Sequence, residues 1–308
     1  MGAQPRLMAR GYWTTRRALS TAAVVLPRRS ALYLPGSNAR ALEKARSLPA
    51  DVVILDLEDA VAPEAKALAR RQVADALRAG GFGRREVVVR INAPESEWGR
   101  EDVQALVGGP SCAVLLPKAE RVESVQSVAS AWSGAAPPPI WCMIETPLGL
   151  LRAAELAAQP TVACLVAGTN DLAADLRCDG GWAERAALLP HLSQIVLAAR
   201  AHGKACLDGV HMDLADDAGL EAACAQGRAL GFDGKTLIHP RTLAAANRAF
   251  APSAAEVERA RRVVAAFEEA RTAGSVLVVL DGKLVEELHV RSARRLLALD
   301  AAVEAGSG

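Results

Sequence analysis

The chain has 308 residues, 51% of them hydrophobic and 4% aromatic, so it can bury one large aliphatic core or two modest ones. It contains no run of about 20 uninterrupted apolar residues, which excludes a membrane-spanning helix. The formal net charge is +1, and no basic run interleaved with aromatics occurs beyond residue 29, which argues against nucleic acid as a partner.

Residues 1–28 form a basic leader. The first 29 residues hold six arginines and no acid, which leaves a net charge of −5 for the rest of the chain. Hydroxyl residues accompany the arginines (Thr14, Thr15, Ser20 and Thr21), and this composition is typical of a mitochondrial transit peptide. We therefore expect import into the mitochondrial matrix, with a basic tail on a cytoplasmic enzyme as the alternative. The six cysteines include no C-x-x-C pair, which favours free thiols in a reducing compartment.

Short β-branched runs then alternate with helical patterns along residues 29–250. Strands are predicted at 31–34, 52–55, 87–91, 113–116, 140–144, 162–166, 204–207 and 234–238. Helices are predicted after them at 39–47, 63–79, 100–106, 122–132, 148–158, 188–201, 220–230 and 241–249. These repeated units predict a (β/α)₈ TIM barrel. A doubly wound open sheet is the alternative, but no G-x-G-x-x-G run follows any strand.

Residues 251–308 predict a C-terminal helical extension. A helix is expected over 254–273, followed by an apolar run at 275–280, a turn at 281–283 and a last helix from about Leu288. This segment is too short for an independent domain. We interpret it as a lid over the barrel mouth or as packing that extends the core.

Every predicted strand ends in polar residues or in residues that an apolar core would not choose. In chain order these are Pro35-Gly36-Ser37, Asp56-Leu57-Glu58-Asp59, Arg90-Ile91-Asn92, Pro117-Lys118, Glu145-Thr146, Asn170-Asp171, Asp208 and His239. Single members of this set could be helix N-caps. Because the carboxyl ends of barrel strands meet at the active-site rim, the set as a whole predicts an active site.

Glu145 and Asp171 end consecutive predicted strands, so they should stand side by side within reach of one small cation. Oxygen ligands without histidine or thiolate favour Mg²⁺, with Mn²⁺ as the alternative. Ion pairs of the two carboxylates with Arg90 and Lys118 are the structural alternative. Arg90 could grip a substrate carboxylate or a developing enolate oxygen through its planar fork, or could instead pair with Glu58 or Asp59.

Several motifs carry a family resemblance. They are Arg29-Ser-Ala-Leu-Tyr-Leu-Pro-Gly36, Asp56-Leu-Glu-Asp-Ala-Val61, Arg90-Ile-Asn92, Leu116-Pro-Lys118, Ile144-Glu-Thr146, Gly168-Thr-Asn-Asp171, Gly234-Lys-Thr-Leu-Ile-His-Pro240 and Gly282-Lys-Leu-Val285. In this order, from about residue 29 to 300, the chain resembles the citrate lyase beta-subunit-like family, which includes malyl-coenzyme A and citramalyl-coenzyme A lyases.

The resemblance implies a magnesium-dependent barrel enzyme with Glu145 and Asp171 as the metal ligands. It implies that Arg90 contacts the keto-acid half of the substrate. The other residues that it assigns to substrate binding, mainly around the coenzyme A and acyl pocket, are Tyr33, Lys44, Asn170, Ile238 and His239. Asn38 stands where relatives can carry an arginine, which removes one phosphate contact.

The activity implied is carbon–carbon cleavage of citramalyl- or malyl-coenzyme A to acetyl-coenzyme A and pyruvate or glyoxylate, by retro-Claisen chemistry. Glu286 occupies the position of the family's acid, an aspartate supplied by a neighbouring subunit, and Asp281 is a weaker candidate. A lid used in this way implies a homo-oligomer, a trimer or a hexamer. The alternatives are a citrate lyase beta subunit acting on a carrier-protein-bound substrate, or a catalytically weak oligomeric paralogue.

Overall fold

The computed structural model describes residues 25–134, 136–178, 185–273 and 278–306. All but the last four residues of the leader predicted at 1–28 lie outside this part of the chain, so the transit peptide stays a prediction. Within the described ranges, no helix combines the length and the apolar character needed to cross a membrane.

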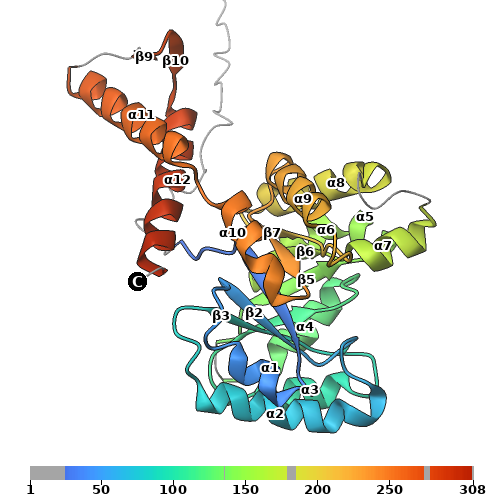
Figure 1. The fold of residues 1–308 in the computed structure, drawn as a ribbon. Helices are drawn as coiled ribbons and strands as arrows, with labels where there is room; N and C mark the ends of the chain where they lie inside the picture. Colours follow the sequence, from blue (N-terminus) through green and yellow to red (C-terminus); the bar gives the residue numbers. More distant parts are fainter. Residues whose placement is uncertain (1–24, 135, 179–184, 274–277, 307–308) are drawn as a thin grey trace, which may run out of the picture.

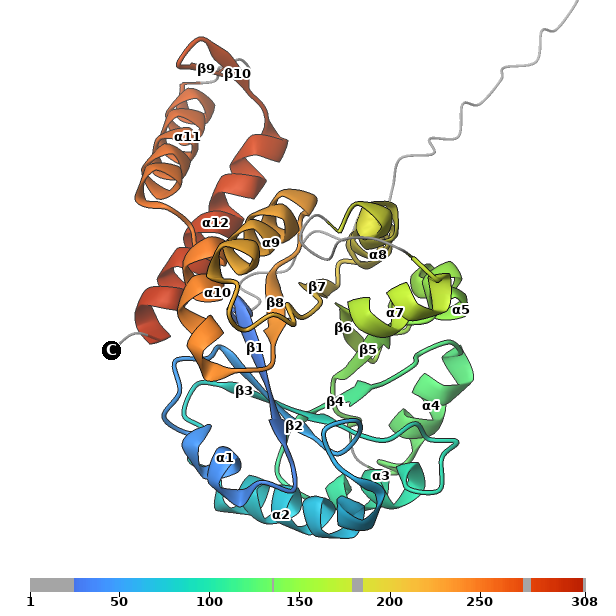
Figure 2. The ribbon, with the colours of Figure 1, turned by 45° about the vertical axis from the view of Figure 1, so that its right-hand side comes forward.

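Eight parallel strands close into a barrel, as Figures 1 and 2 show, because each strand pairs with the next and β8 pairs with β1. The strands are β1 (Ser30–Pro35), β2 (Val52–Asp56), β3 (Glu86–Arg90), β4 (Ala113–Leu116), β5 (Ile140–Ile144), β6 (Val162–Ala167), β7 (Ala205–Asp208) and β8 (Gly234–Leu237). Each lies within one residue of its predicted bounds. The predicted TIM barrel is therefore confirmed.

Helices cover the outside of the barrel. They are α1 (Ala39–Lys44), η1 (Pro63–Ala65), α2 (Lys66–Ala79), α3 (Gly99–Leu106), α4 (Val122–Ser130), α5 (Pro147–Leu151), α6 (Ala153–Ala157), α7 (Thr169–Leu176), η2 (Ala186–Leu188), α8 (Leu189–Ala201), α9 (Asp217–Leu230), η3 (Pro240–Thr242) and α10 (Leu243–Phe250). Two predictions were incomplete. The helix expected over 148–158 breaks at Arg152 into α5 and α6, and α7 was not predicted.

The strands bury both of their faces. In β2, for example, Val53 and Leu55 pack with the outer helices, whereas Val52 and Ile54 point into the barrel interior, where Trp141 is fully buried. Such strands read as continuous apolar runs, which explains why they were recognisable in the sequence. Polar side chains are consequently concentrated at the strand ends.

The start of the barrel includes an arginine that the sequence reading had placed in the leader. The guanidinium of Arg28 donates to both carboxylate oxygens of Glu86, at 2.6 and 2.9 Å, and lies over the ring of Trp141 at 5.1 Å. Arg29 pairs in the same bidentate way with Asp51. The folded unit therefore begins at or before Arg28.

The C-terminal extension consists of α11 (Ala254–Thr272), an antiparallel hairpin of β9 (Val278–Leu280) and β10 (Lys283–Val285), and α12 (Glu287–Gly306). The helical extension is confirmed, while β10 had not been predicted. The extension has a small hydrophobic core of its own. It stands beside the barrel, as Figures 1 and 2 show. Its last helix contacts the barrel through Arg295 with Asp233 at 2.8 Å and through the carbonyl of Ala305 with Arg84 at 2.6 Å. Both barrel residues precede strands, so α12 lies toward the amino-terminal end of the barrel.

Candidate active site

Glu145 directly follows β5 at the carboxyl-terminal end of the barrel and is 2% exposed. Its Oε1 accepts a 2.6 Å hydrogen bond from the backbone N–H of Lys118. Space for this carboxylate depends on Gly168, where an added Cβ would lie 2.3 Å from Glu145 Cβ and 2.7 Å from Oε2. The backbone of two neighbouring strand ends thus fixes the position of the carboxylate.

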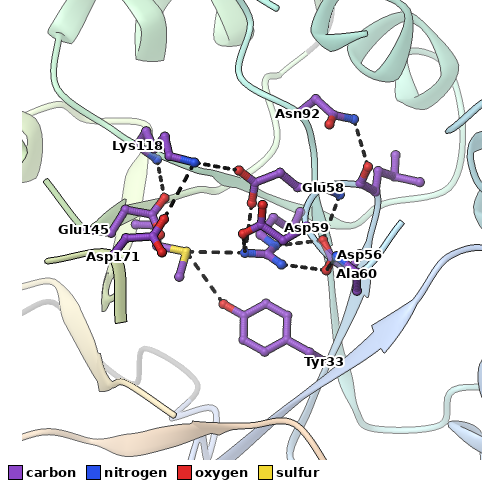
Figure 3. A network of polar contacts seen from close by, with 12 residues as sticks. Tyr33, Asp56, Glu58, Asp59, Ala60, Asn92, Lys118, Glu145 and Asp171 are labelled. Atoms are coloured by element: carbon purple, nitrogen blue, oxygen red, sulfur yellow. Dashed lines mark hydrogen bonds and ion pairs between the residues drawn. The ribbon is translucent and has the colours of Figure 1, made fainter. Parts of the chain in front are cut away.

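Asp171 lies beside Glu145, although it does not end a strand as the sequence reading placed it. It belongs to the first turn of α7, and its side chain is 42% exposed. Figure 3 shows the two carboxylates next to each other, with Lys118 reaching both. One ligand candidate is therefore buried, while the other is partly exposed to solvent.

Lys118 and Glu58 also belong to this site, as their place among the polar strand ends predicts, although neither was assigned a role in catalysis, substrate binding or metal binding. The ammonium of Lys118 lies 3.7 Å from Asp171 Oδ2 and 3.5 Å from Glu58 Oε1, and its backbone has a positive φ of 45°. Both residues follow strand ends, which is the same signal that identified Glu145. Lys118 partly realises the ion-pair alternative for the two carboxylates.

Arg90 is buried at the end of β3 and held mainly by Asp56, a partner that the sequence reading had not considered. Its Nε and Nη2 donate to the two oxygens of Asp56, at 2.7 and 2.6 Å. Its Nη1 lies 2.9 Å from Glu58 and 3.5 Å from Asp59, so the expected alternative partners are also present. The guanidinium packs over the ring of Tyr33 at 4.8 Å. One edge of the fork is thus fixed, and Nη1 faces the site.

The polar network in Figure 3 carries an excess of negative charge. Two cations, Arg90 and Lys118, face five carboxylates: those of Asp56, Glu58, Asp59, Glu145 and Asp171. Burial, together with the charges of Glu58 and Asp171, raises the pKa of Glu145 to about 8. Burial also raises the pKa of Glu58, although Arg90 acts against this.

This charge excess fits a bound divalent cation, which would relieve the repulsion around Glu145. The donor set contains oxygens and neither imidazole nor thiolate, so a hard cation suits it. Among the described residues, no group of three or more His, Cys, Asp or Glu side chains could hold a metal ion. A cation held by Glu145 and Asp171 would therefore take its other ligands from water and substrate.

The remaining predicted substrate residues occupy two kinds of position. Tyr33 and Asn170 lie next to the site: Tyr33 packs under Arg90, and Asn170 precedes Asp171 and has a buried Oδ1 without a hydrogen-bond partner. Lys44 ends α1 and is exposed, while Ile238 and His239 follow β8 and are exposed at the carboxyl-terminal end of the barrel. The assignment of these three residues to a coenzyme A pocket stays a prediction. Asn38 caps α1 by accepting from the N–H of Ala41.

The two acid candidates lie in the C-terminal extension, away from the carboxylate pair. Asp281 forms the hairpin turn with φ 51° and accepts a 2.5 Å hydrogen bond from Arg262. Glu286 is exposed just after β10, and its backbone N–H donates to His289 Nδ1 at 2.9 Å. Because the extension attaches toward the opposite end of the barrel, neither is brought to the site of its own chain.

Comparison with known proteins gives one family and consistent structural neighbours. A family model described as HpcH/HpaI aldolase/citrate lyase matches residues 29–240. A (3S)-malyl-CoA thioesterase of Cereibacter sphaeroides is 48% identical over 279 residues, which span 91% of this chain and 96% of that protein. Citrate lyase subunit beta of Escherichia coli K12 is 37% identical over 280 residues, 88% of this chain and 92% of the relative.

A solved structure has the same architecture. The CitE protein of Mycobacterium tuberculosis, in complex with magnesium, acetoacetate and coenzyme A, superposes with a TM-score of 0.73 at 33% identity. The match covers 88% of this chain and 97% of that one. The barrel and its C-terminal extension therefore both fall within the similarity.

Proposed function

The chain belongs to the HpcH/HpaI aldolase/citrate lyase family, and from this premise we propose that it is a magnesium-dependent carbon–carbon lyase. Its proposed substrate is a 3-hydroxyacyl-coenzyme A dicarboxylate, citramalyl- or malyl-coenzyme A, cleaved to acetyl-coenzyme A and a 2-oxo acid. The observation that carries this proposal is the Glu145–Asp171 carboxylate pair beside the fixed guanidinium of Arg90.

Each residue has a defined task in this proposal. Glu145 and Asp171 would hold Mg²⁺ or Mn²⁺, which when bound supplies positive charge to substrate oxygens. Arg90 binds the carboxylate of the keto-acid half through Nη1, in place of the ion pair of Nη1 with Glu58, since its other edge is occupied by Asp56. A general base takes the substrate hydroxyl proton, the carbonyl of the 2-oxo acid forms, and the adjacent carbon–carbon bond breaks with its electron pair passing to the enolate of acetyl-coenzyme A. The enolate carbon left on acetyl-coenzyme A takes a proton from a general acid, for which Glu286 of another subunit is our candidate.

The relatives support the two ligand classes. Magnesium and coenzyme A are bound together in the CitE structure of M. tuberculosis, and that structure matches nearly the whole chain. A citrate lyase beta subunit acting on a carrier-bound substrate remains an alternative, through the 37% identical E. coli protein. A catalytically weak paralogue is disfavoured, because the carboxylate pair and Arg90 are assembled in one network.

Thioester hydrolysis of the same substrate is the second candidate function. It is favoured by the relative from C. sphaeroides that is 48% identical over 96% of its length and is named a (3S)-malyl-CoA thioesterase. The two reactions share the acyl group and the carboxylate pair that would hold the cation, but they break different bonds. Hydrolysis releases malate and the free thiol of coenzyme A, whereas cleavage leaves the thiol esterified as acetyl-coenzyme A.

One assay separates the two reactions. Purified protein is given (3S)-malyl- or citramalyl-coenzyme A with Mg²⁺ or with EDTA, and both the 2-oxo acid and the free thiol are measured. We expect glyoxylate or pyruvate to appear without an equivalent of free thiol, and only with Mg²⁺. Free thiol without oxo acid would replace the lyase by the hydrolase.

The variant that tests the metal site is Glu145→Gln, which removes the charge of one proposed ligand with little change in shape. We expect at least a hundredfold loss of turnover, since outer-shell changes alone cost 10- to 100-fold at metal sites. Full activity of this variant would contradict the metal assignment. If the wild-type protein releases neither 2-oxo acid nor free thiol from either substrate, both candidate functions are excluded.

A further inference from the structure

A buried ion cluster lies at the end of β7, next to the candidate site. Asp208 has no exposed surface, and its carboxylate accepts hydrogen bonds from Arg185 Nη1 at 2.7 and 2.8 Å and from Lys235 Nζ at 2.9 Å. Burial by itself would raise the pKa of Asp208, but the charges and hydrogen bonds of Lys235 and Arg185 outweigh it and lower the pKa. The carboxylate therefore stays ionised while it is fully buried.

Arg185 joins this cluster to a second element, helix α9. Its Nη1 donates to both oxygens of Asp208, and its Nε donates to Gln226 in α9, at 3.0 Å. Arg185 is 5% exposed and has φ 47°, a strained value for a residue other than glycine. The orientation of the Asp208 carboxylate is thus fixed from two sides, by Arg185 and by Lys235.

Asp208 reaches the start of α7, the helix whose first turn contains Asp171, through Gly209. The N–H of Gly209 donates to Asp208 Oδ1 at 2.8 Å. Gly209 packs tightly against Thr169, since an added Cβ would lie 2.4 Å from Thr169 Oγ1 and 2.8 Å from the carbonyl of Ala167. Three residues later, Met212 Sδ lies 3.1 Å from Asn170 Nδ2. The loop after β7 therefore contacts the residues immediately before Asp171.

We propose that the Asp208–Arg185–Lys235 cluster positions Asp171 relative to Glu145, with Arg185 as a positioning residue for the cation site. Burying one anion with two cations is costly, and apolar residues of similar size often serve stability equally well or better. A cluster that only stabilised the barrel could lie anywhere in it. This one contacts, through Gly209, the residues immediately before Asp171, one of the two carboxylates. The inference rests on the proposed function, because it assumes that Asp171 binds the cation.

The test compares two arginine variants for Mn²⁺ binding, followed by the electron paramagnetic resonance of free Mn²⁺. Arg185→Met removes two of the three hydrogen bonds that cationic side chains donate to the Asp208 carboxylate, and it leaves the Asp208–Lys235 pair balanced. Arg200→Met is the matched control: Arg200 pairs with Asp233 at 2.9 Å, before β8 and at the other end of the barrel. We expect Arg185→Met to raise the Mn²⁺ dissociation constant roughly tenfold, the scale of changes around metal ligands, and Arg200→Met to leave it unchanged.

Unfolding temperatures of both variants separate positioning from stability. If Arg185→Met binds Mn²⁺ as tightly as the wild-type protein, the cluster is only structural and the inference is overturned. Should that variant not fold, Gly209→Ala tests the contact between the loop after β7 and the start of α7 without removing a charge. The added Cβ would displace the turn at Thr169. Unchanged Mn²⁺ binding by Gly209→Ala would then overturn the inference. A wild-type protein that does not bind Mn²⁺ would instead refute the metal site of the proposed function, and the inference with it.

Discussion

At the residue scale, Glu145 combines deep burial with a raised pKa. Its pKa of about 8 in the folded state compares with 4.5 for an unperturbed glutamate, so between these values the folded state binds the proton that the unfolded state has lost. The free energy of unfolding of the metal-free protein should therefore fall as the pH rises from about 5 to 8. The full span corresponds to at most about 5 kcal/mol. Urea denaturation in EDTA at several pH values measures this slope.

Replacing Glu145 by glutamine should flatten most of this slope, because the amide does not titrate. Part of the slope should remain, since burial also raises the pKa of Glu58. The control is Glu155→Gln, at an exposed position in α6, which should keep the wild-type slope. A Glu145→Gln variant with the wild-type slope would show that Glu145 ionises normally in the folded protein.

The positions of individual charged residues could be predicted from the sequence where the residue lies at the end of an apolar strand. Glu145 and Arg90 were recognisable because each charged group follows an apolar run. The main partner of Arg90 was not recognisable, because Asp56 and Arg90 face each other only through the β2–β3 register, 34 residues apart in the chain. The metal-ligand role of Asp171 stays a prediction, and its position in α7 rather than at a strand end required the structure.

At the element scale, the ion pair before β1 should contribute more to stability than an exposed pair on a helix. The Arg28 and Glu86 side chains are 16% and 13% exposed, and Arg28 also lies over Trp141. Arg28→Met should lower the free energy of unfolding by about 2 kcal/mol, because it leaves a largely buried carboxylate without its partner. Guanidinium chloride denaturation of a chain that begins well before Arg28 gives this value.

The comparison variant is Arg78→Met. Arg78 pairs with Asp75 within α2, but these side chains are 61% and 71% exposed, so its loss should cost below about 0.5 kcal/mol. Equal losses in the two variants would contradict a structural role for Arg28. They would also support the prediction from composition that Arg28 belongs to the leader.

The barrel strands, each an apolar run, were predicted within one residue of their bounds, whereas the hairpin strand β10 was not predicted. The hairpin strand β10 has only three residues, Lys283–Val285, of which Val285 alone is buried. A single inward side chain gives no alternation to detect. The predicted turn at Asp281-Gly282 was correct in place, since both residues adopt positive φ values of 51° and 72°.

At the scale of the whole molecule, the extension presents an apolar face that its own chain leaves exposed. Val279 and Leu284 are cross-strand neighbours in the hairpin and are 60% and 51% exposed, and Leu288 at the start of α12 is 52% exposed. Exposed apolar groups that cluster in this way favour a contact with another protein surface. Together with the distance of the extension from its own site, this supports our expectation of a homo-oligomer in which the hairpin serves a neighbouring barrel.

Mixed oligomers test that arrangement directly. Glu145→Gln removes the metal ligand of a barrel, and Glu286→Gln removes the proposed acid of an extension, so each homo-oligomer should be nearly inactive. In a co-expressed one-to-one mixture, a Glu286→Gln barrel can meet the intact extension of a Glu145→Gln neighbour. Random assembly should then restore about one quarter of the wild-type activity, because half of the barrels are intact and half of their neighbours supply Glu286.

Asp281→Asn is the control that identifies the acid. Asp281 is engaged by Arg262 and shapes the turn, so its loss should lower stability more than turnover. If each subunit used its own extension, no site in the mixture would hold both groups and activity would stay at the level of the separate variants. A fully active Glu286→Gln homo-oligomer would instead remove Glu286 from the reaction, and Asp281 would become the remaining candidate in the hairpin.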